Sequence, residues 1–184
     1  MKVIQSHISG LFTLEPNVFE DERGYFIESF NEKGFKQATG VDVDFVQDNE
    51  SKSNKGVLRG LHFQIPPYAQ DKLVRVVRGS AMDVAVDLRQ DSPTFGEYEK
   101  VLLTERNKKQ FFIPKGFAHG FLVLEDQTIF SYKCSDFYNR ESERSLKWND
   151  PSVGIEWEVE NPILSSKDEN TQTTLDDFRT TFGA

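Results

Sequence analysis

Apolar and polar residues alternate along much of the chain, and this spacing predicts short β-strands. In the segment 81–88 the large apolar residues occupy every second position, as Met82, Val84, Val86 and Leu88. A period of two is that of a strand, because successive side chains of a strand point to opposite faces. A second apolar run covers residues 73–78, and Gly79-Ser80 between the two runs predicts a hairpin turn.

Further runs of this kind predict an all-β fold. The remaining expected strands cover residues 24–30, 43–47, 57–64, 98–104, 110–113, 120–124 and 128–134. Turn-forming residues separate them, and many short strands with regular turns favour a sandwich or a barrel. Two short helices are expected at its periphery, over 32–38 before Gly40 and over 174–179. Weaker periodicity after Pro151 predicts a loop-rich extension packed over the barrel.

Length and composition narrow the class of protein. A chain of 184 residues most simply forms one domain over residues 1–184, and its 16 phenylalanines supply large rings for a core. The net charge of −8 argues against non-specific nucleic-acid or membrane binding, although a local basic pocket remains compatible with it. A single cysteine, Cys134, fits a reducing compartment, and no signal peptide or membrane-length run is found. These features predict a cytoplasmic protein.

Two of the three histidines lie in strings that resemble the two halves of the cupin signature. The strings are Leu58-Arg-Gly-Leu-His62-Phe-Gln64 and Pro114-Lys-Gly-Phe-Ala-His119. Gln64 stands where a metal-binding cupin has a second histidine, and no glutamate follows before Gly79. Two histidines fall short of the three protein ligands of a typical catalytic divalent site. The strings therefore predict acid–base chemistry without a metal.

The likeness extends beyond the cupin signature to one family. Several strings in sequence order resemble the dTDP-4-dehydrorhamnose 3,5-epimerase family, from about Gly24 through Asp168. Each string is weak alone, whereas their order is specific. They are the segments 57–64, 69–76, 83–89, 92–96 and 112–121, the pair Tyr132-Lys133, Tyr138, and the segment 148–151.

The resemblance implies a cupin-type jelly-roll homodimer with no cofactor, acting on a dTDP-linked 4-keto-6-deoxy sugar. It implies that dTDP-4-dehydro-6-deoxy-D-glucose is inverted at C3 and C5 to dTDP-4-dehydro-L-rhamnose, which feeds dTDP-L-rhamnose synthesis. Three alternatives stay open. They are a single-site epimerase acting at C3 or C5 alone, a metal-dependent cupin enzyme, and a cupin that binds a sugar nucleotide without catalysis.

Carried over from the family, four residues would perform the chemistry. A proton beside a ketone is removed by a base, and the enolate needs a donor at O4 and an acid on the opposite face. His62 would be the base, Asp168 would hold its far ring nitrogen, Lys72 would stabilise O4, and Tyr132 would be the acid. Taken singly, these residues also fit a core histidine, a solvated aspartate, a surface lysine and a core aromatic residue.

The resemblance also implies a set of substrate-binding residues. They are Arg23, Phe26, Glu28, Gln47, Asn49, Arg59, His119, Tyr138, Glu143 and Lys167. The guanidinium groups of Arg23 and Arg59 suit phosphate oxygens. Strict alternation places Arg59 on the face opposite His62, and either a β-bulge or service to a neighbouring subunit would resolve this. In the family, the segment around Arg23 reaches across the dimer.

Overall fold

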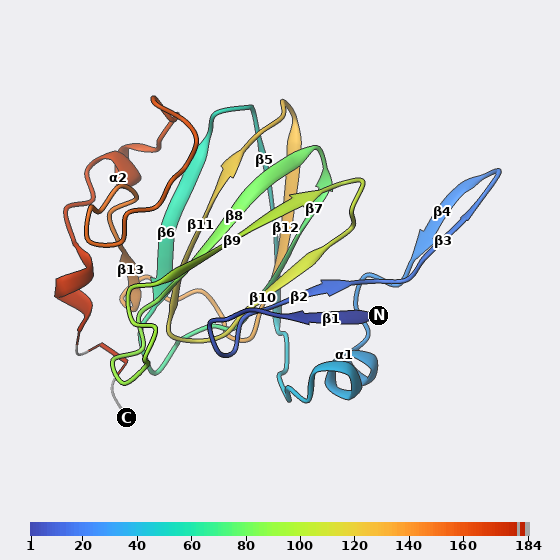
Figure 1. Ribbon diagram of the computed structural model, residues 1–184, viewed down its shortest axis with the longest axis horizontal. Helices are drawn as coiled ribbons and strands as arrows, with labels where there is room; N and C mark the ends of the chain where they lie inside the picture. The colour runs from blue at the N-terminus through green and yellow to red at the C-terminus, as the bar shows by residue number, and fades with distance from the viewer. Residues whose placement is uncertain (180, 183–184) are drawn as a thin grey trace.

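Two antiparallel sheets face each other in the computed structural model, which describes residues 1–179 and 181–182 (Figure 1). The six-stranded sheet has the order β1 (Lys2–Gln5), β2 (Phe12–Glu15), β10 (Gln110–Ile113), β7 (Lys72–Arg78), β12 (Thr128–Cys134) and β5 (Gln47–Ser53). The five-stranded sheet has the order β13 (Glu143–Ser145), β6 (Leu58–Gln64), β11 (Phe117–Val123), β8 (Ser80–Asp87) and β9 (Tyr98–Thr104). The all-β prediction is confirmed.

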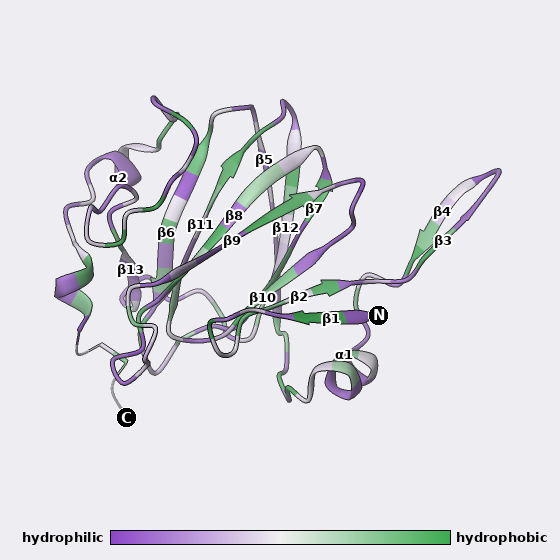
Figure 2. Ribbon diagram, in the orientation of Figure 1, coloured by the Kyte–Doolittle hydropathy of each residue, from purple (hydrophilic) through white to green (hydrophobic). Residues whose placement is uncertain are grey.

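The space between the sheets holds the main core. Phe121 of β11 and Phe130 of β12 stack across it, with ring centroids 3.9 Å apart. The alternation along β8 divides its residues between two cores. Ala81 and Ala85 face the other sheet, whereas Val84 and its alternate neighbours face the chain after Pro151. Figure 2 shows the hydrophobic colouring of β11 beside the more polar β6.

The C-terminal chain covers the outer face of the five-stranded sheet, as the loop-rich prediction required. Trp157 is buried there, and Phe178 meets Phe63 of β6 edge to face at 5.0 Å between centroids. This chain contains a short helix that was not predicted, α2 (Ser166–Glu169), and a 3₁₀ helix, Leu175–Phe178, inside the expected range 174–179. A sheet covered on both faces explains why β8 and β11 are buried almost throughout.

The helix expected over 32–38 is present as α1 (Glu32–Thr39), and it packs on part of the outer face of the six-stranded sheet. The side chain of Asn31 accepts a hydrogen bond from the backbone N–H of Gly34 and so caps the helix start. Gly40 ends the helix in the left-handed conformation, with φ 74°. Phe35 anchors the helix among Phe12 and Phe112 of the sheet.

Two strand predictions are wrong. The turn at Gly79-Ser80 does not close a hairpin, because β7 pairs with β10 and β12 whereas β8 pairs with β9 and β11. It carries the chain from one sheet to the other, and runs that are apolar on both faces do not specify their partner locally. The strand expected over 43–47 instead runs as β5 from Gln47, because its polar residues hide the alternation. Strands β1, β2, β3 (Val18–Asp21) and β13 were not predicted.

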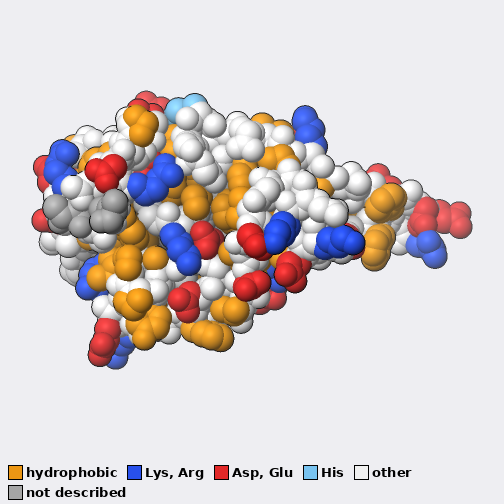
Figure 3. All heavy atoms as spheres, turned by 90° about the horizontal axis from the view of Figure 1, so that it is seen from below, with side chains coloured by type: hydrophobic (Ala, Val, Ile, Leu, Met, Phe, Trp, Pro, Cys, Tyr) orange, Lys and Arg blue, Asp and Glu red, His pale blue; other side chains and the backbone are white. Residues whose placement is uncertain are grey.

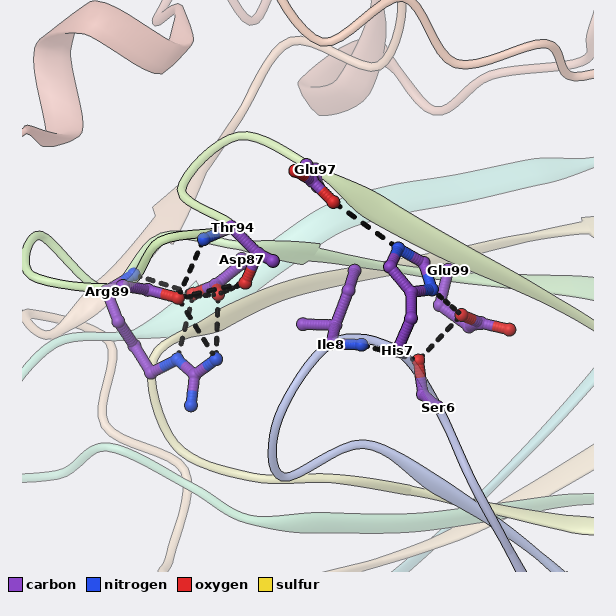
Figure 4. Close-up of polar contacts among 9 residues, drawn as sticks. Ser6, His7, Ile8, Asp87, Arg89, Thr94, Glu97 and Glu99 are labelled. Carbon is purple, nitrogen blue, oxygen red and sulfur yellow. Dashed lines mark hydrogen bonds and ion pairs between the residues drawn. The ribbon is translucent and has the colours of Figure 1, made fainter.

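Polar contacts hold the end of β8 and the N-terminal chain (Figure 4). The carboxylate of Asp87 is fully buried and accepts hydrogen bonds from the backbone and guanidinium of Arg89 and from the hydroxyl groups of Ser92 and Thr94. On the neighbouring strand β9 and just before it, Glu99 and Glu97 pair with the two ring nitrogens of His7 at 3.2 and 3.3 Å. These contacts fix the loop between β8 and β9.

A hairpin of β3 (Val18–Asp21) and β4 (Gly24–Ile27) extends away from the two sheets (Figures 1 and 3). We call residues 18–27 the arm. Its aromatic residues Phe19, Tyr25 and Phe26 are 62, 54 and 67% exposed. Isolated two-stranded hairpins are marginal in water, so an arm of this kind points to a surface that it covers. Within the described residues, no helix is long and apolar enough to cross a membrane.

Candidate active site

A cavity of about 620 Å³ lies between the two sheets. Strands β5, β7 and β12 of one sheet and β6, β11 and β13 of the other line it, with the start of α2. Ten of the fourteen residues expected at the site are on its walls. They are Gln47, Asn49, Arg59, His62, Lys72, His119, Tyr132, Tyr138, Glu143 and Asp168.

A β-bulge in β6 places Arg59 and His62 on the same cavity. His62 lies opposite His119 of β11, and Arg59 lies opposite Phe121. Three steps along β6 therefore match two along β11, and the additional residue reverses the alternation. The bulge brings the backbones together at Gly60 and Gly120, where a Cβ on Gly60 would lie 2.6 Å from the Gly120 Cα. The sequence left two explanations open for how Arg59 and His62 could serve one site, and the structure shows the β-bulge.

The imidazole of His62 is held by Asp168. The Nε2 atom of His62 lies 2.6 Å from Oδ1 of Asp168, and the Asp168 side chain is 3% exposed. The hydroxyl of Ser165 donates to the other carboxylate oxygen at 2.9 Å and caps α2 by accepting from the Asp168 N–H. Burial acts to raise the pKa of Asp168, but the hydrogen bonds and charge of His62 and the Ser165 hydroxyl hold it below the ordinary value.

The arrangement leaves Nδ1 of His62 as the ring nitrogen not bonded to Asp168. A carboxylate at Nε2 places the proton there and the lone pair on Nδ1, which suits Nδ1 to accept a proton. The His62 side chain is 30% exposed, so a ligand in the cavity can reach it. Sequence reasoning missed Ser165, although a serine three residues before an aspartate is a recognisable helix-start signal.

Lys72 and His119 also line the cavity and are buried more deeply than His62. The Lys72 ammonium donates to the His62 carbonyl at 3.3 Å, and burial lowers the pKa of Lys72. His119 places Nε2 2.9 Å from Oδ2 of Asp83, and burial lowers the pKa of His119 as well. Asp83 received no role from the sequence, although it is a carboxylate on a strand whose other residues are mostly apolar.

Tyr132 approaches the cavity from the sheet opposite His62. It lies on β12 between Asn49 of β5 and Val74 of β7, whereas His62 lies on β6. Burial raises the pKa of Tyr132 above that of a free phenol, with Cys134 adding to the shift. The phenol therefore carries its proton near pH 7 and can donate it.

Polar residues at one end of the cavity form a connected rim. Glu143 accepts a hydrogen bond from the Tyr138 hydroxyl at 3.1 Å and pairs with Lys167 at 2.7 Å. Lys167 itself lies beside this rim and does not line the cavity wall. The side chain of Gln47 donates to Asn49 and accepts from the Tyr138 backbone N–H. At another point of the wall, the Arg59 guanidinium donates to the Ser53 hydroxyl at 3.0 and 3.2 Å.

Three of the expected residues lie away from the cavity, on or beside the arm. The Arg23 side chain is 85% exposed and pairs with Asp21. Phe26 and Glu28 border a separate cavity of about 510 Å³ between the arm and α1. A single chain therefore does not bring these three residues to His62.

The cavity between the two sheets, which holds His62 and His119, has no evident set of metal ligands among the described residues. Within residues 1–179 and 181–182, no group of three or more His, Cys, Asp and Glu side chains is placed to hold a metal ion. His62 and His119 each direct Nε2 to a carboxylate. The arrangement is suited to moving protons, with a basic ring on one wall, a phenol on the other, and an ammonium group between the sheets.

Comparison with known proteins gives a consistent result. The family model of dTDP-4-dehydrorhamnose 3,5-epimerase matches residues 5–176. An enzyme of that name from Shigella flexneri is 56% identical over 96% of this chain and 97% of its own. The crystal structure of the epimerase from Elizabethkingia anophelis superposes with a TM-score of 0.91 at 50% identity, covering 97% of this chain and 98% of that one.

A third relative carries a ligand. The dTDP-6-deoxy-D-glucose-3,5-epimerase of Legionella pneumophila was solved in complex with dTDP-4-keto-L-rhamnose. It is 48% identical to this chain, with a TM-score of 0.91, over 95% of this chain and 93% of that one. Because these matches span nearly the whole chain, they include every wall of the cavity.

Proposed function

The chain belongs to the dTDP-4-dehydrorhamnose 3,5-epimerase family, and we propose that it inverts C3 and C5 of dTDP-4-dehydro-6-deoxy-D-glucose. The product is dTDP-4-dehydro-L-rhamnose, and the protein is an isomerase of dTDP-L-rhamnose synthesis. One observation carries the assignment of roles. A His62–Asp168 pair and a protonated Tyr132 face one cavity from opposite sheets, with Lys72 between them.

The first step is proton removal by His62. The hydrogens on C3 and C5 are acidic because each carbon adjoins the C4 ketone, and loss of either proton sends the C–H electron pair towards O4. Nδ1 of His62 takes the proton, because Nε2 is engaged by Asp168. The negative charge of Asp168 then stabilises the imidazolium ion.

Lys72 stabilises the enolate. Its ammonium group has three donors, and one of them is directed to the His62 carbonyl at 3.3 Å. A further donor can meet O4 as negative charge develops there. A fixed donor in a buried site stabilises such charge more strongly than water does, because it needs no reorientation during the reaction.

Tyr132 completes each inversion by delivering a proton to the opposite face. The imidazolium of His62 then loses its proton to water and the phenolate of Tyr132 regains one, which readies both groups for the second carbon. Base and acid come from β6 and β12, which belong to the two facing sheets. A proton removed from one face of the sugar and returned from the other reverses the configuration. The C4 carbon is a ketone in both substrate and product, so no electrons are exchanged with a cofactor.

The remaining polar groups suit the nucleotide part of the substrate. Arg59 offers a guanidinium group to the diphosphate. The rim formed by Gln47, Asn49, Tyr138 and Glu143, with Lys167 behind it, is placed for the thymidine end, where the Tyr138 ring can stack on the base. His119 orders the deeper end beside Lys72.

We further propose that the enzyme is a homodimer in which each arm reaches the cavity of the partner subunit. Arg23 and Phe26 would then contribute a cation and an aromatic face to the partner's site, and Glu28 would lie at the base of the arm. Their exposure of 85% at the Arg23 side chain and 67% at Phe26 supports this arrangement, as does the extension of the arm from the body (Figure 1). Aromatic residues and arginine are enriched in interface cores.

The test is proton NMR in deuterated water with dTDP-4-dehydro-6-deoxy-D-glucose and enzyme treated with a chelator. We expect deuterium at both C3 and C5 and the appearance of the L-configured product. Label at one carbon alone would identify a single-site epimerase. No label from folded protein would refute the proposed substrate, and activity that vanishes with the chelator would indicate a metal-dependent enzyme.

A further inference from the structure

Asp83 is a buried carboxylate to which the proposed mechanism gives no task. It lies in the middle of β8 on the face shared by Ala81 and Ala85, and its exposed fraction is 0%. Removing a carboxylate from water is expensive unless the group is paired and hydrogen-bonded. A fully apolar residue would fit this face of the strand, so the carboxylate calls for an explanation from its neighbours.

The two oxygens of Asp83 have different surroundings. Oδ2 lies 2.9 Å from Nε2 of His119, which fixes the orientation of that ring. Oδ1 has no hydrogen-bond partner among the described residues. One half of the carboxylate therefore has hydrogen-bonding capacity and negative charge that nothing in the hydrogen-bond network takes up.

Lys72 is a buried cation whose hydrogen-bond partner carries no charge. Its ammonium group is directed to the carbonyl of His62. Burial lowers the pKa of Lys72, and Cys134, Asp83 and Glu143 oppose this shift. Cys134 is a thiol whose pKa burial raises, so it carries no charge near pH 7. Glu143 already pairs with Lys167 at 2.7 Å. Asp83 is left as the negative charge that can act on Lys72, at a range beyond a direct ion pair, while its Oδ2 is held by His119.

Building on the proposed epimerisation, we propose that Asp83 is a positioning residue that orients His119 and supplies the charge that keeps Lys72 an ammonium ion. Burial acts on Asp83 and Lys72 in the same sense, towards loss of charge, and each charge opposes that loss in the other. Loss of either charge would promote loss of the other, so the two groups are charged together or neutral together. With its Nε2–H directed to Asp83, a neutral His119 has its lone pair on Nδ1 and accepts a hydrogen bond, which leaves Lys72 as the donor to O4.

The test uses Asp83→Asn, which removes the charge and keeps the shape. Lys72 is followed by NMR titration of 13C-labelled lysine, and its signal is assigned by its loss in Lys72→Met. We expect Lys72 in the wild-type enzyme to be charged at pH 7.5, and its titration to fall by about one pH unit or more in Asp83→Asn. We expect kcat to fall by on the order of 100-fold, as when one oxyanion donor is removed, with dTDP affinity unchanged.

The matched control is Asp87→Asn, on the same strand and the same face. Asp87 is equally buried but bonds to Arg89, Ser92 and Thr94, away from the cavity walls. The Asp87→Asn substitution should lower the stability of the protein without moving the Lys72 titration. A second comparison places Asp83→Asn in the Lys72→Met background, where it should cost little further stability, because the charge that it would leave unpaired is already gone.

A Lys72 titration that is the same in the wild-type enzyme and in Asp83→Asn overturns the proposal, and so does a neutral Lys72 in the wild-type enzyme at pH 7.5. The wild-type titration needs no variant at position 83, so a neutral Lys72 overturns the proposal even if Asp83→Asn does not fold. A purely structural role would lower the melting temperature and dTDP binding together and leave the titration unmoved. If wild-type protein shows no deuterium exchange, the proposed function fails, whereas the Lys72 titration still reports on the Asp83–Lys72 pair.

Discussion

Replacing Asp168 with asparagine removes the negative charge beside His62 and keeps the shape of the side chain. The two groups are joined by a 2.6 Å contact from Nε2 to Oδ1. Two unit charges about 4 Å apart attract by about 4 kcal/mol at an effective dielectric constant of about 20. Each 1.4 kcal/mol corresponds to about tenfold in rate, so full loss of this attraction in the transition state is about a thousandfold.

Two features of the site change this expected thousandfold loss of rate, in opposite directions. The His62 side chain is 30% exposed, so water screens part of the attraction, which reduces the loss. An asparagine amide can donate a hydrogen bond to Nε2 and so place the imidazole proton on Nδ1, the atom that must accept a proton. This change of tautomer increases the loss of rate. We therefore expect kcat to fall by about 100- to 1000-fold.

The assay is the rate of deuterium incorporation at C3 and C5, measured across pH. The imidazolium that forms in Asp168→Asn has lost its charged partner, so the maximal rate of the profile should fall. Glu169→Gln is the control, because Glu169 is the exposed neighbour of Asp168 on α2. Exchange within about threefold of the wild-type rate in folded Asp168→Asn would refute the reasoning.

Three further predictions concern the acid, the support of Asp168 and the stability of the fold. Tyr132→Phe should retain proton exchange on the His62 side but lose net inversion by about 100-fold or more, seen by NMR as label without change of configuration; normal inversion would place the acid elsewhere. Ser165→Ala removes the hydroxyl bond to Asp168, about 1 kcal/mol, and should lower kcat/KM about fivefold. Ser165→Thr should restore the rate, Ser166→Ala should leave it unchanged, and a loss in both alanine variants would contradict the role of Ser165. Burial acts to raise the pKa of Asp87, but Arg89, Ser92 and Thr94 hold it below the ordinary value, so its stabilisation is present above about pH 4 and is lost as pH falls through the lower folded pKa. Melting temperatures should therefore fall more steeply below about pH 4 in the wild-type protein than in Asp87→Asn, and parallel curves would contradict this.

Local pattern was sufficient for the strands that alternate clearly. The bounds predicted for β9, β10 and β12 match the structure, and so does the end of α1 at Gly40. It failed for β5, because an edge strand with polar residues on both faces has no apolar period to detect. It also failed at Gly79-Ser80, because the choice between a hairpin and a crossing to the other sheet depends on strands that are distant in the chain.

Some residues of the candidate site could be predicted from the sequence, and others could be recognised only in the structure. The two histidine strings stood out in the sequence itself, and the family resemblance gave Lys72, Tyr132 and Asp168 their expected roles. Asp83 was not singled out, because its importance comes from facing His119 at 2.9 Å inside a closed interior. The residues of the arm were expected at the site, but the single chain places them elsewhere.

The sequence by itself determined the fold class, the family and the kinds of group available for proton transfer, because strand periodicity and short motifs are local properties. Tertiary structure decided which of those groups meet. The bulge between Arg59 and His62 changes the facing of a strand by one residue, and it depends on the close approach of Gly60 to Gly120. Burial likewise acts on two pKa values, lowering that of Lys72 and raising that of Asp83. Geometry and burial arise from contacts between distant segments, which no local pattern of residues specifies.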